Sequence, residues 1–290
     1  MKTLNIKIFD LNRGNSIFIK TSNGKTILFD IGGEIPVDYL FENNIELDYL
    51  IISHPHKDHI KGLLRLSENN INPKIFSVNK NFPQELYEKL LSNASEIDKP
   101  IYEKYMSMVN YYKFPIPYDL KLDNPDNWGG LEFIPFIPNE KDKLEVNYYS
   151  LALLIKFYDG KILLMGDNDL DNISEIKNDT NYNELEKIDI LLAPHHGLDS
   201  SFDSEFVSHL NPLLTIISDK SDENSAINKY YKKTRGLIVS NETRHCLTTH
   251  NDGDIFVDYY HDNEGTYIHV HLDDKTIEEN FIKLTELIEP

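Results

Sequence analysis

The segment that most constrains this chain is an apolar run, residues 47–53, which leads directly into the sequence HPHKDH at positions 54–59. An apolar run of this length bounded by polar residues predicts a buried strand. The six positions that follow hold three imidazoles and a carboxylate, the donors that divalent transition metals prefer. The first two histidines are two positions apart, so in an extended chain they point the same way. Asp58 and His59 fall at the turn into the next helix and are expected to face a second metal beside the first.

Two later segments also place polar donors directly after an apolar strand. Asp167 follows the strand 161–165 and a glycine, where its carboxylate could bridge two metals. The alternative for this aspartate is an N-cap of the helix that follows. His195 and His196 follow the strand 188–193 and a proline. One of them can ligate a metal while the other contacts substrate or hydrogen-bonds the first, and the alternative is a pair of surface histidines.

Composition narrows the classes of protein that are open. The 290 residues include 29 basic and 48 acidic ones, a formal net charge of −19, which argues against broad coating of nucleic acid. Two bound cations could still attract one phosphate group, so the charge favours a small or single-stranded phosphodiester substrate. No apolar run is long enough to span a membrane, and the N-terminal segment lacks a signal-peptide core. The single cysteine, Cys246, excludes an intrachain disulfide and favours a reducing cytoplasm.

The hydrophobic pattern predicts one domain over residues 1–290, with a partly helical insertion around 70–145. Both halves run from strands to helices, so we expect an α/β fold with two sheets in the middle and helices outside, an αββα four-layer sandwich. The strands are expected at 4–10, 17–19, 25–29, 47–53, 150–157, 161–165, 188–193, 213–218, 237–239, 255–259 and 267–272. The helices are expected at 36–43, 59–66, twice within 83–112, at 224–233 and at 275–288.

Taken together, the donor motifs resemble the metallo-β-lactamase superfamily of dinuclear metallohydrolases. More narrowly, the chain resembles the hydrolase domain of ComEC-type competence proteins and its free-standing relatives. That narrower resemblance rests on residues 9–16, 23–25, 30–33, 147–153 and 193–197. It implies the αββα fold, two divalent ions and phosphodiesterase or nuclease activity.

Three departures from these relatives bear on the site. Residues 12–15 read NRGN, where the ComEC-like group usually has Gly-Gln-Gly-Asp. Many members of the superfamily supply a third histidine to the first metal from the middle of the chain, but here no histidine lies between His59 and His195. Asn147 or Ser150 is expected to occupy that region of the site instead. Residues 218–225 lack the second histidine motif frequent in the group. His56 stands where oxygen-reducing di-iron members carry glutamate, so the resemblance implies zinc or manganese hydrolysis.

The predicted reaction is phosphodiester cleavage by a water that two metals activate to a bridging hydroxide. The predicted metal ligands are His54, His56, Asp58, His59, Asp167 and His196, and the predicted catalytic residues are Asp58 and His195. The predicted substrate-binding residues are Asn147, Ser150, Ser200 and Ser201. The last two are expected to bind phosphate through the following helix N-terminus or simply to cap that helix.

Two other functions stay open. One is hydrolysis of an ester, thioester or lactone. The other is a regulatory or assembly subunit whose metal site is structural or vestigial. The acidic composition also suits a basic protein partner. Among the weaker candidates, Arg244 and His245 could reach the site from a late loop, and His269 and His271 are expected to be structural or exposed.

Overall fold

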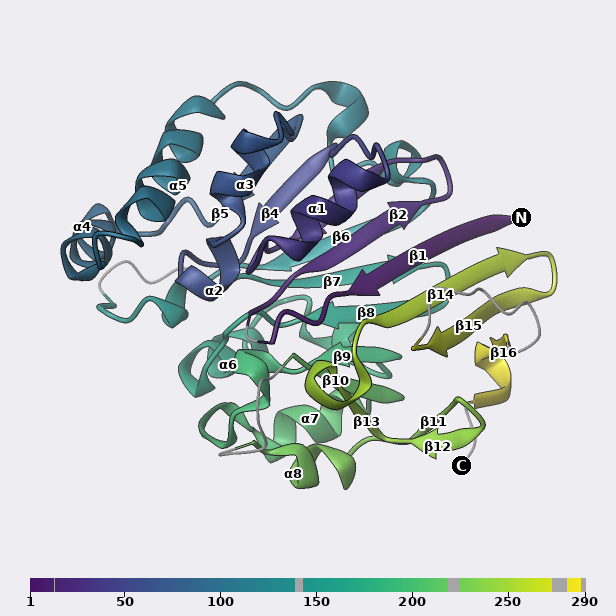
Figure 1. Ribbon diagram of the computed structural model, residues 1–290. Coiled ribbons are helices and arrows are strands. Elements are labelled where there is room, and N and C mark those ends of the chain that lie inside the picture. The colour runs from purple at the N-terminus through teal and green to yellow at the C-terminus, as the bar shows by residue number, and fades with distance from the viewer. Residues whose placement is uncertain (13, 139–142, 219–224, 273–280, 288–290) are drawn as a thin grey trace.

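The computed structural model describes residues 1–12, 14–138, 143–218, 225–272 and 281–287. Over these residues the chain forms two central β-sheets with helices on the outer faces, the predicted αββα arrangement (Figure 1). The larger sheet has the strand order β16-β15-β14-β1-β2-β3-β4-β5. Its strands are β1 (Lys2–Ile8), β2 (Ile17–Thr21), β3 (Thr26–Phe29), β4 (Tyr49–Ile52), β5 (Ile75–Val78), β14 (Ile255–Asp262), β15 (Gly265–His271) and β16 (Ile282–Lys283).

The second sheet has the strand order β13-β10-β9-β8-β7-β6. Its strands are β6 (Leu131–Phe136), β7 (Ala152–Phe157), β8 (Gly160–Leu164), β9 (Ile190–Leu192), β10 (Leu214–Ile217) and β13 (Cys246–Thr248), and a separate ribbon pairs β11 (Leu237–Val239) with β12 (Glu242–Arg244). β8, β9 and β10 are parallel, so their carboxyl ends meet at one edge of the sheet. In the larger sheet, β3, β4 and β5 are parallel as well.

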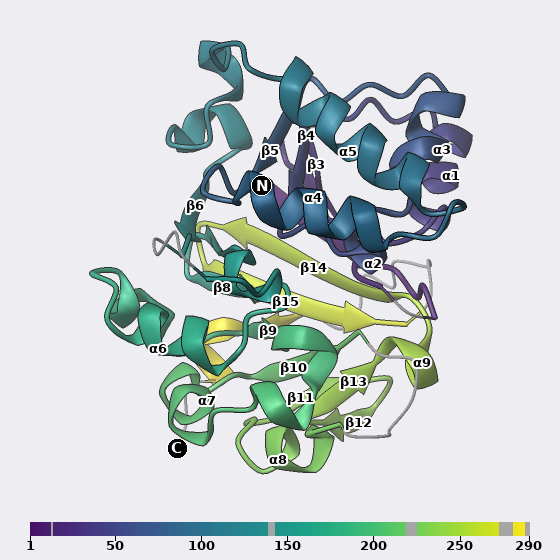
Figure 2. The ribbon, with the colours of Figure 1, turned by 90° about the vertical axis from the view of Figure 1, so that its left-hand side faces the viewer.

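Helices cover the outer face of each sheet (Figure 2). On the larger sheet they are α1 (Ile35–Glu42), α2 (Lys57–Ile60), α3 (Leu63–Glu68), α4 (Gln84–Asn93) and α5 (Lys99–Tyr111). The second sheet carries α6 (Leu170–Lys177), α7 (Ser204–Leu210) and α8 (Ile227–Tyr231), and α9 (Thr249–Asp252) follows β13. The apolar core is accordingly layered. One cluster, which includes Leu4 and Ile155, fills the space between the sheets, and one cluster lies under each helical layer.

Two of the parallel strands that lead to the predicted site, β4 and β9, are buried along their whole length. Every residue of β4 and of β9 is buried, which explains why each reads as an uninterrupted apolar run in the sequence. A strand held on both faces fixes the position of the residues that follow it. The donors after β4, β8 and β9 are therefore presented by rigid elements.

Some predicted elements differ from the observed ones. The amphipathic helix predicted at 275–288 is wrong over the described part, because Ile282–Lys283 form β16 and Leu284–Leu287 form a short 3-10 helix. The rest of the predicted helix, apart from residue 281, lies outside the described residues. The helix predicted at 59–66 is divided into α2 and α3. The predicted insertion at 70–145 contains α4 and α5, and it also supplies β5 and β6, each at one edge of a sheet. Within the described parts of the chain, no helix has the length and apolar character needed to cross a bilayer.

Candidate metal centre

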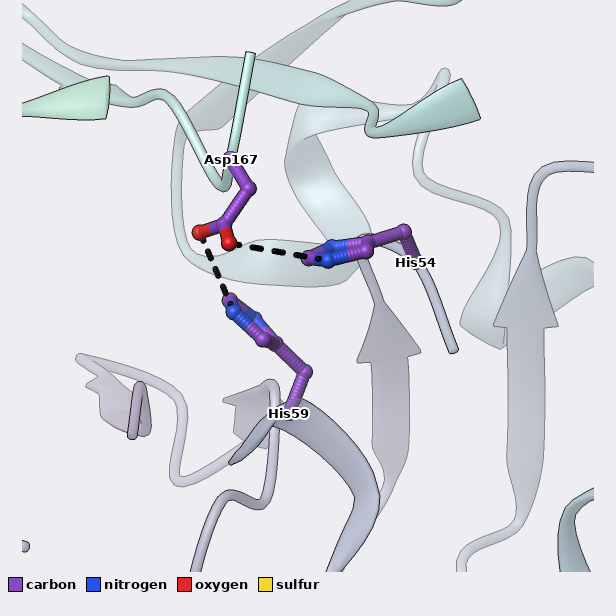
Figure 3. A group of neighbouring side chains, drawn as sticks. All are labelled: His54, His59 and Asp167. Atoms are coloured by element: carbon purple, nitrogen blue, oxygen red, sulfur yellow. Dashed lines mark ion pairs between the residues drawn. The ribbon is translucent and has the colours of Figure 1, made fainter. Parts of the chain in front are cut away.

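Three buried side chains that can bind a metal ion, from distant parts of the sequence, meet where β4 of the larger sheet and β8 of the second sheet end. His54 lies two residues after β4, His59 lies on α2, and Asp167 lies three residues after β8. His59 Nε2 is 3.1 Å from Asp167 Oδ1, and His54 Nε2 is 3.7 Å from Asp167 Oδ2 (Figure 3). All three side chains are almost fully buried. Each of these residues was predicted as a metal ligand, and the fold brings them together.

A second group of donors adjoins the first and shares His59 with it. His196 Nε2 is 3.6 Å from Asp58 Oδ2 and 3.6 Å from Asp167 Oδ1. Candidate ligand atoms of Asp58, His59 and His196 all lie within 4.8 Å of one another, as do those of the first group. His56 joins from the other side, with its Nδ1 3.0 Å from His54 Nε2. All six predicted ligands thus belong to one connected cluster, here called the metal centre.

The backbone around the later donors is strained. His195 and His196 both adopt left-handed conformations, with φ of 48° and 54°. Left-handed backbone costs a non-glycine residue about 1–2 kcal/mol, so the surrounding structure must impose it. The hydrogen bond from the His195 N–H to the Gly166 carbonyl, 2.9 Å long, ties this turn to the loop that carries Asp167. The strain is therefore stored where two imidazoles must turn back toward the centre.

A buried carboxylate that sequence reasoning did not assign to the site, Asp30, orients His59. Asp30 directly follows β3 and has no exposed surface. It accepts hydrogen bonds from the Ser53 N–H (2.7 Å), the Ser53 hydroxyl (2.8 Å) and the Asn15 amide (3.1 Å), and its Oδ2 is 2.7 Å from His59 Nδ1. His59 Nδ1 carries the proton and donates a hydrogen bond to Asp30. The other ring nitrogen, Nε2, faces Asp167 and can bind a metal ion through its lone pair. The signal was present in the sequence, since Asp30 also follows an apolar strand.

His196 is oriented in the same way by a backbone carbonyl. Its Nδ1 is 2.7 Å from the carbonyl oxygen of Ser218, which can only accept, so the proton lies on Nδ1. Within the described part of the chain, the Nε2 atoms of both His59 and His196 are buried and have no hydrogen-bond partner. Buried nitrogens without a partner are costly. Two such atoms beside two carboxylates are a donor set that fits divalent cations.

The electrostatics of the centre also favour added positive charge. Burial by itself would lower the pKa of His59, but Asp167 and Asp30 raise it well above its usual value. Burial would raise the pKa of Asp167, yet the surrounding imidazoles, that of His59 foremost, hold it well below its usual value. Burial lowers the pKa of His54, which stays a neutral imidazole. Without a cation, protons on His59 would supply the charge that the carboxylates require.

Asp58 is ionised for a related reason. Burial alone would raise its pKa, but the imidazole of His196, whose Nε2 is 3.6 Å from Asp58 Oδ2, and the charge of His59 hold the pKa below its usual value. Its side chain is 24% exposed, so it lies toward the open side of the centre. An ionised, partly exposed carboxylate can bind a cation and also face substrate.

His195 lies at the mouth of the centre. Its side chain is 26% exposed, and its Nε2 is 3.8 Å from Asp167 Oδ2. The ring is held on both sides, with Nε2 3.3 Å from Asn147 Nδ2 and Nδ1 3.2 Å from the hydroxyl of Ser201. Asn147, one of the two residues predicted for the region that lacks a mid-chain histidine, therefore contacts His195. The Oδ1 atom of Asn147 is buried and has no partner in the described ranges of the chain.

The predicted serines occupy different places. Ser150 is fully buried, and its hydroxyl accepts a hydrogen bond of 2.9 Å from the N–H of Asp167. Ser200 is exposed on the short turn that also contains Ser201, which is buried. Neither caps the following helix, because Asp203 is the N-cap of α7. The N-cap reading of Asp167 is likewise wrong, since Asp169 caps α6.

The late-loop candidates have partners outside the centre. Arg244 forms an ion pair of 2.8 Å with Asp252, and His245 Nδ1 is 2.7 Å from the carbonyl of Thr234. These contacts account for both residues within the ribbon and loop that carry them.

Residues 10–214 match the family described as the Metallo-beta-lactamase superfamily. Because this match covers most of the chain, the protein belongs to that superfamily, whose members are generally hydrolases that use divalent metals. The predicted resemblance and the αββα fold class are confirmed.

Two curated proteins are similar in sequence. Recombination protein 2 of Haemophilus influenzae is 24% identical over 226 residues, covering 74% of this chain and 24% of that protein. Hydroxyacylglutathione hydrolase 1 of Vibrio vulnificus is 35% identical over 63 residues, 21% of this chain and 26% of that protein. The chain spans about a quarter of the length of these curated relatives.

Solved structures are similar at a lower level. A long form of RNase Z from yeast is 11% identical with a TM-score of 0.47, covering 99% of this chain and 51% of that chain. A metallo-beta-lactamase-like protein from Thermotoga maritima is 18% identical with a TM-score of 0.41, covering 66% of this chain and 96% of that chain.

Proposed function

We propose that this protein is a phosphodiesterase or nuclease that works with two divalent ions, zinc or manganese. The observation that carries the dinuclear site is the position of Asp167. Its Oδ1 faces His59 and His196, at 3.1 and 3.6 Å, and its Oδ2 faces His54 and His195, at 3.7 and 3.8 Å. A carboxylate whose two oxygens face different imidazoles is suited to bridging two cations.

The ligands divide between two positions. His54, His56 and Asp167 would hold one ion, and Asp58, His59 and His196 would hold the other, with Asp167 shared. His59 lies close to both groups and is assigned here to the second. Bound there, divalent ions would polarise a phosphoryl oxygen and lower the pKa of water, which is the chemistry that hydrolysis at neutral pH requires.

The protein's own groups would orient these donors and move the proton. Asp30 and the Ser218 carbonyl hold the Nδ1 side of two imidazoles, so that their Nε2 atoms point at the centre and would be available to a bound ion. His195 is the partly exposed imidazole, held between Asn147 and Ser201, so we assign it the transfer of a proton to the leaving oxygen. Ser150 would act by positioning the Asp167 backbone rather than by touching substrate.

A nucleic-acid or nucleotide substrate is supported by the similarity to Recombination protein 2, whose name places that protein in recombination. The net charge of −19 favours a short or single-stranded phosphodiester over a long duplex, because a duplex presents many phosphates to an acidic surface. A purely regulatory or assembly role with a vestigial site is disfavoured because all six predicted ligands lie in one cluster.

Thioester hydrolysis is the second candidate. The local similarity to hydroxyacylglutathione hydrolase 1, 35% over 63 residues, supports it. A substrate panel separates the two functions, because turnover of thioesters or lactones without turnover of phosphodiesters would favour this second candidate.

We also propose that the protein works in the cytoplasm and binds a basic protein partner. The single cysteine, Cys246, is buried and fits a reducing compartment, and the excess of acidic residues fits a basic partner. A pull-down with a salt titration tests the partner. Failure to capture any protein at low salt would remove this part of the proposal.

The function is tested by hydrolysis of bis-p-nitrophenyl phosphate with added zinc or manganese. We expect Asp58→Ala and His56→Ala to lose most of the wild-type rate. His209→Ala is a matched control, since this histidine stacks on Tyr182 away from the centre. Equal rates in the two centre variants and the wild type would overturn the proposal.

A further inference from the structure

A further cluster of side chains that could hold a metal ion lies on the larger sheet, on strands that carry none of the residues of the metal centre. It consists of Asp258 on β14 and of His269 and His271 on β15. Candidate ligand atoms of the three residues all lie within 4.8 Å of one another. The ligands of the metal centre instead follow β4, β8 and β9. The two clusters therefore come from separate parts of the fold.

The strand register explains why these three side chains meet. β14 and β15 are antiparallel, and Asp258 is directly opposite His269. Since side chains alternate along a strand, His271 projects from the same face as His269. The intervening residues, Val257 and Ile268 among them, project to the other face and belong to the core between the sheets. The cluster is thus on the outer face of the larger sheet.

Burial and hydrogen bonding leave one donor without a partner. His269 is 6% exposed, and its Nδ1 is buried with no hydrogen-bond partner among the residues that the structure describes. Asp258 is also 6% exposed. His271 Nε2 is 3.0 Å from Asp258 Oδ2, while Asp258 Oδ1 accepts a hydrogen bond of 2.7 Å from the amide of Asn5. A hydrogen bond between His271 and Asp258 accounts for those two residues, but it leaves His269 unexplained.

We propose that Asp258, His269 and His271 form an additional zinc site, separate from the metal centre. Two imidazoles and one carboxylate suit zinc, with water as the fourth ligand, whereas magnesium and calcium prefer oxygen donors alone. Ligand atoms around a tetrahedral zinc ion are about 3.3 Å apart, given bonds of about 2.05 Å. The 3.0 Å between His271 Nε2 and Asp258 Oδ2 is close to this spacing. Asn5 would orient the carboxylate from the neighbouring strand β1.

Such a site would act structurally. A zinc ion held by one ligand from β14 and two from β15 would cross-link these strands near one side of the sheet. The inference does not depend on the proposed phosphodiesterase activity, because the cluster contains none of the residues assigned to that reaction.

Zinc content measures the site directly. The full-length wild type, His269→Ala, His271→Ala and the control His261→Ala are saturated with zinc, dialysed and assayed for bound metal. His261 lies on β14 but is bonded to Thr266 and stacked on Tyr158, away from the cluster. We expect both cluster variants to retain one zinc per chain less than the wild type, and His261→Ala to match it. Equal zinc in all four proteins overturns the proposal.

Crystals of the wild type soaked in zinc give a second measurement, which does not depend on a variant that folds. An anomalous-difference peak at the zinc edge between Asp258, His269 and His271 is the expected result. A map without a peak at this cluster overturns the proposal, whatever the occupancy of the metal centre.

Discussion

Asp30→Asn tests whether a buried carboxylate outside the ligand set controls metal binding. Asp30 Oδ1 accepts the Ser53 N–H, and Oδ2 faces His59 Nδ1 at 2.7 Å and the Ser53 hydroxyl at 2.8 Å. In the variant, an amide NH₂ would replace the oxygen at His59 and would require an acceptor there. The imidazole then moves its proton to Nε2, which is the atom that faces Asp167.

The size of the effect follows from this change of tautomer. Loss of a carboxylate that orients a metal-ligating histidine costs about 10- to 100-fold in metal affinity. That loss corresponds to about 1.4–2.7 kcal/mol of binding free energy. The metal-free protein also loses a charge-assisted hydrogen bond, which contributes about 1.5–3 kcal/mol to its stability.

The assay is competition for zinc against a chelator of known affinity, with chemical denaturation of the metal-free protein alongside. Asp189→Asn is the matched control, because Asp189 is also a buried carboxylate but bonds the N–H of Lys161 on β8. We expect the control to bind zinc like the wild type. If folded Asp30→Asn bound zinc within twofold of wild type, the proposed orientation of His59 would be refuted.

Three further predictions concern the centre and the stability of the fold. His196→Ala is expected to lose bound metal. His195→Ala is expected to keep the metal and to lower kcat by about 10²- to 10⁴-fold. The metal content and the kinetics of both variants check these two outcomes. Gly32→Ala is expected to destabilise the fold and reduce activity, because a Cβ there would overlap the backbone oxygen of Asp58. Gly33→Ala is the control, since a Cβ at that position meets only the side chain of Leu11. Thermal unfolding of the two variants compares their stability. Burial raises the pKa of Asp189 to about 7. The pKa of this aspartate is about 4 in the unfolded state, so between about pH 4 and about pH 7 the folded state binds more protons than the unfolded state. The free energy of unfolding therefore falls as pH rises through this window, by at most about 1.4 kcal/mol per pH unit. Asp189→Asn should remove this pH dependence of the free energy of unfolding. If the free energies of unfolding of the wild type and of Asp189→Asn changed equally between pH 5 and pH 8, the expectation would be contradicted.

Much of the fold and most of the ligand cluster could be predicted because the signals are local. A strand buried on both faces is an unbroken apolar run, and the residues that follow it emerge at a defined edge of the sheet. His54, Asp167 and His196 were predicted in this way, and the fold brings all three into one cluster. The C-terminal segment was predicted incorrectly because amphipathic periodicity alone does not reveal that residues 282–283 pair with β15.

What the sequence determined by itself is the set of donors at the ends of apolar strands, since identity and spacing along the chain specify both. Only the tertiary structure decided which atoms of those donors are available. The proton on His59 is positioned by Asp30, 29 residues away, and that on His196 by the Ser218 carbonyl, 22 residues away. The pairing of β14 with β15 likewise places Asp258 beside His269. Contacts of this kind depend on the relative placement of whole strands, which no short stretch of sequence encodes.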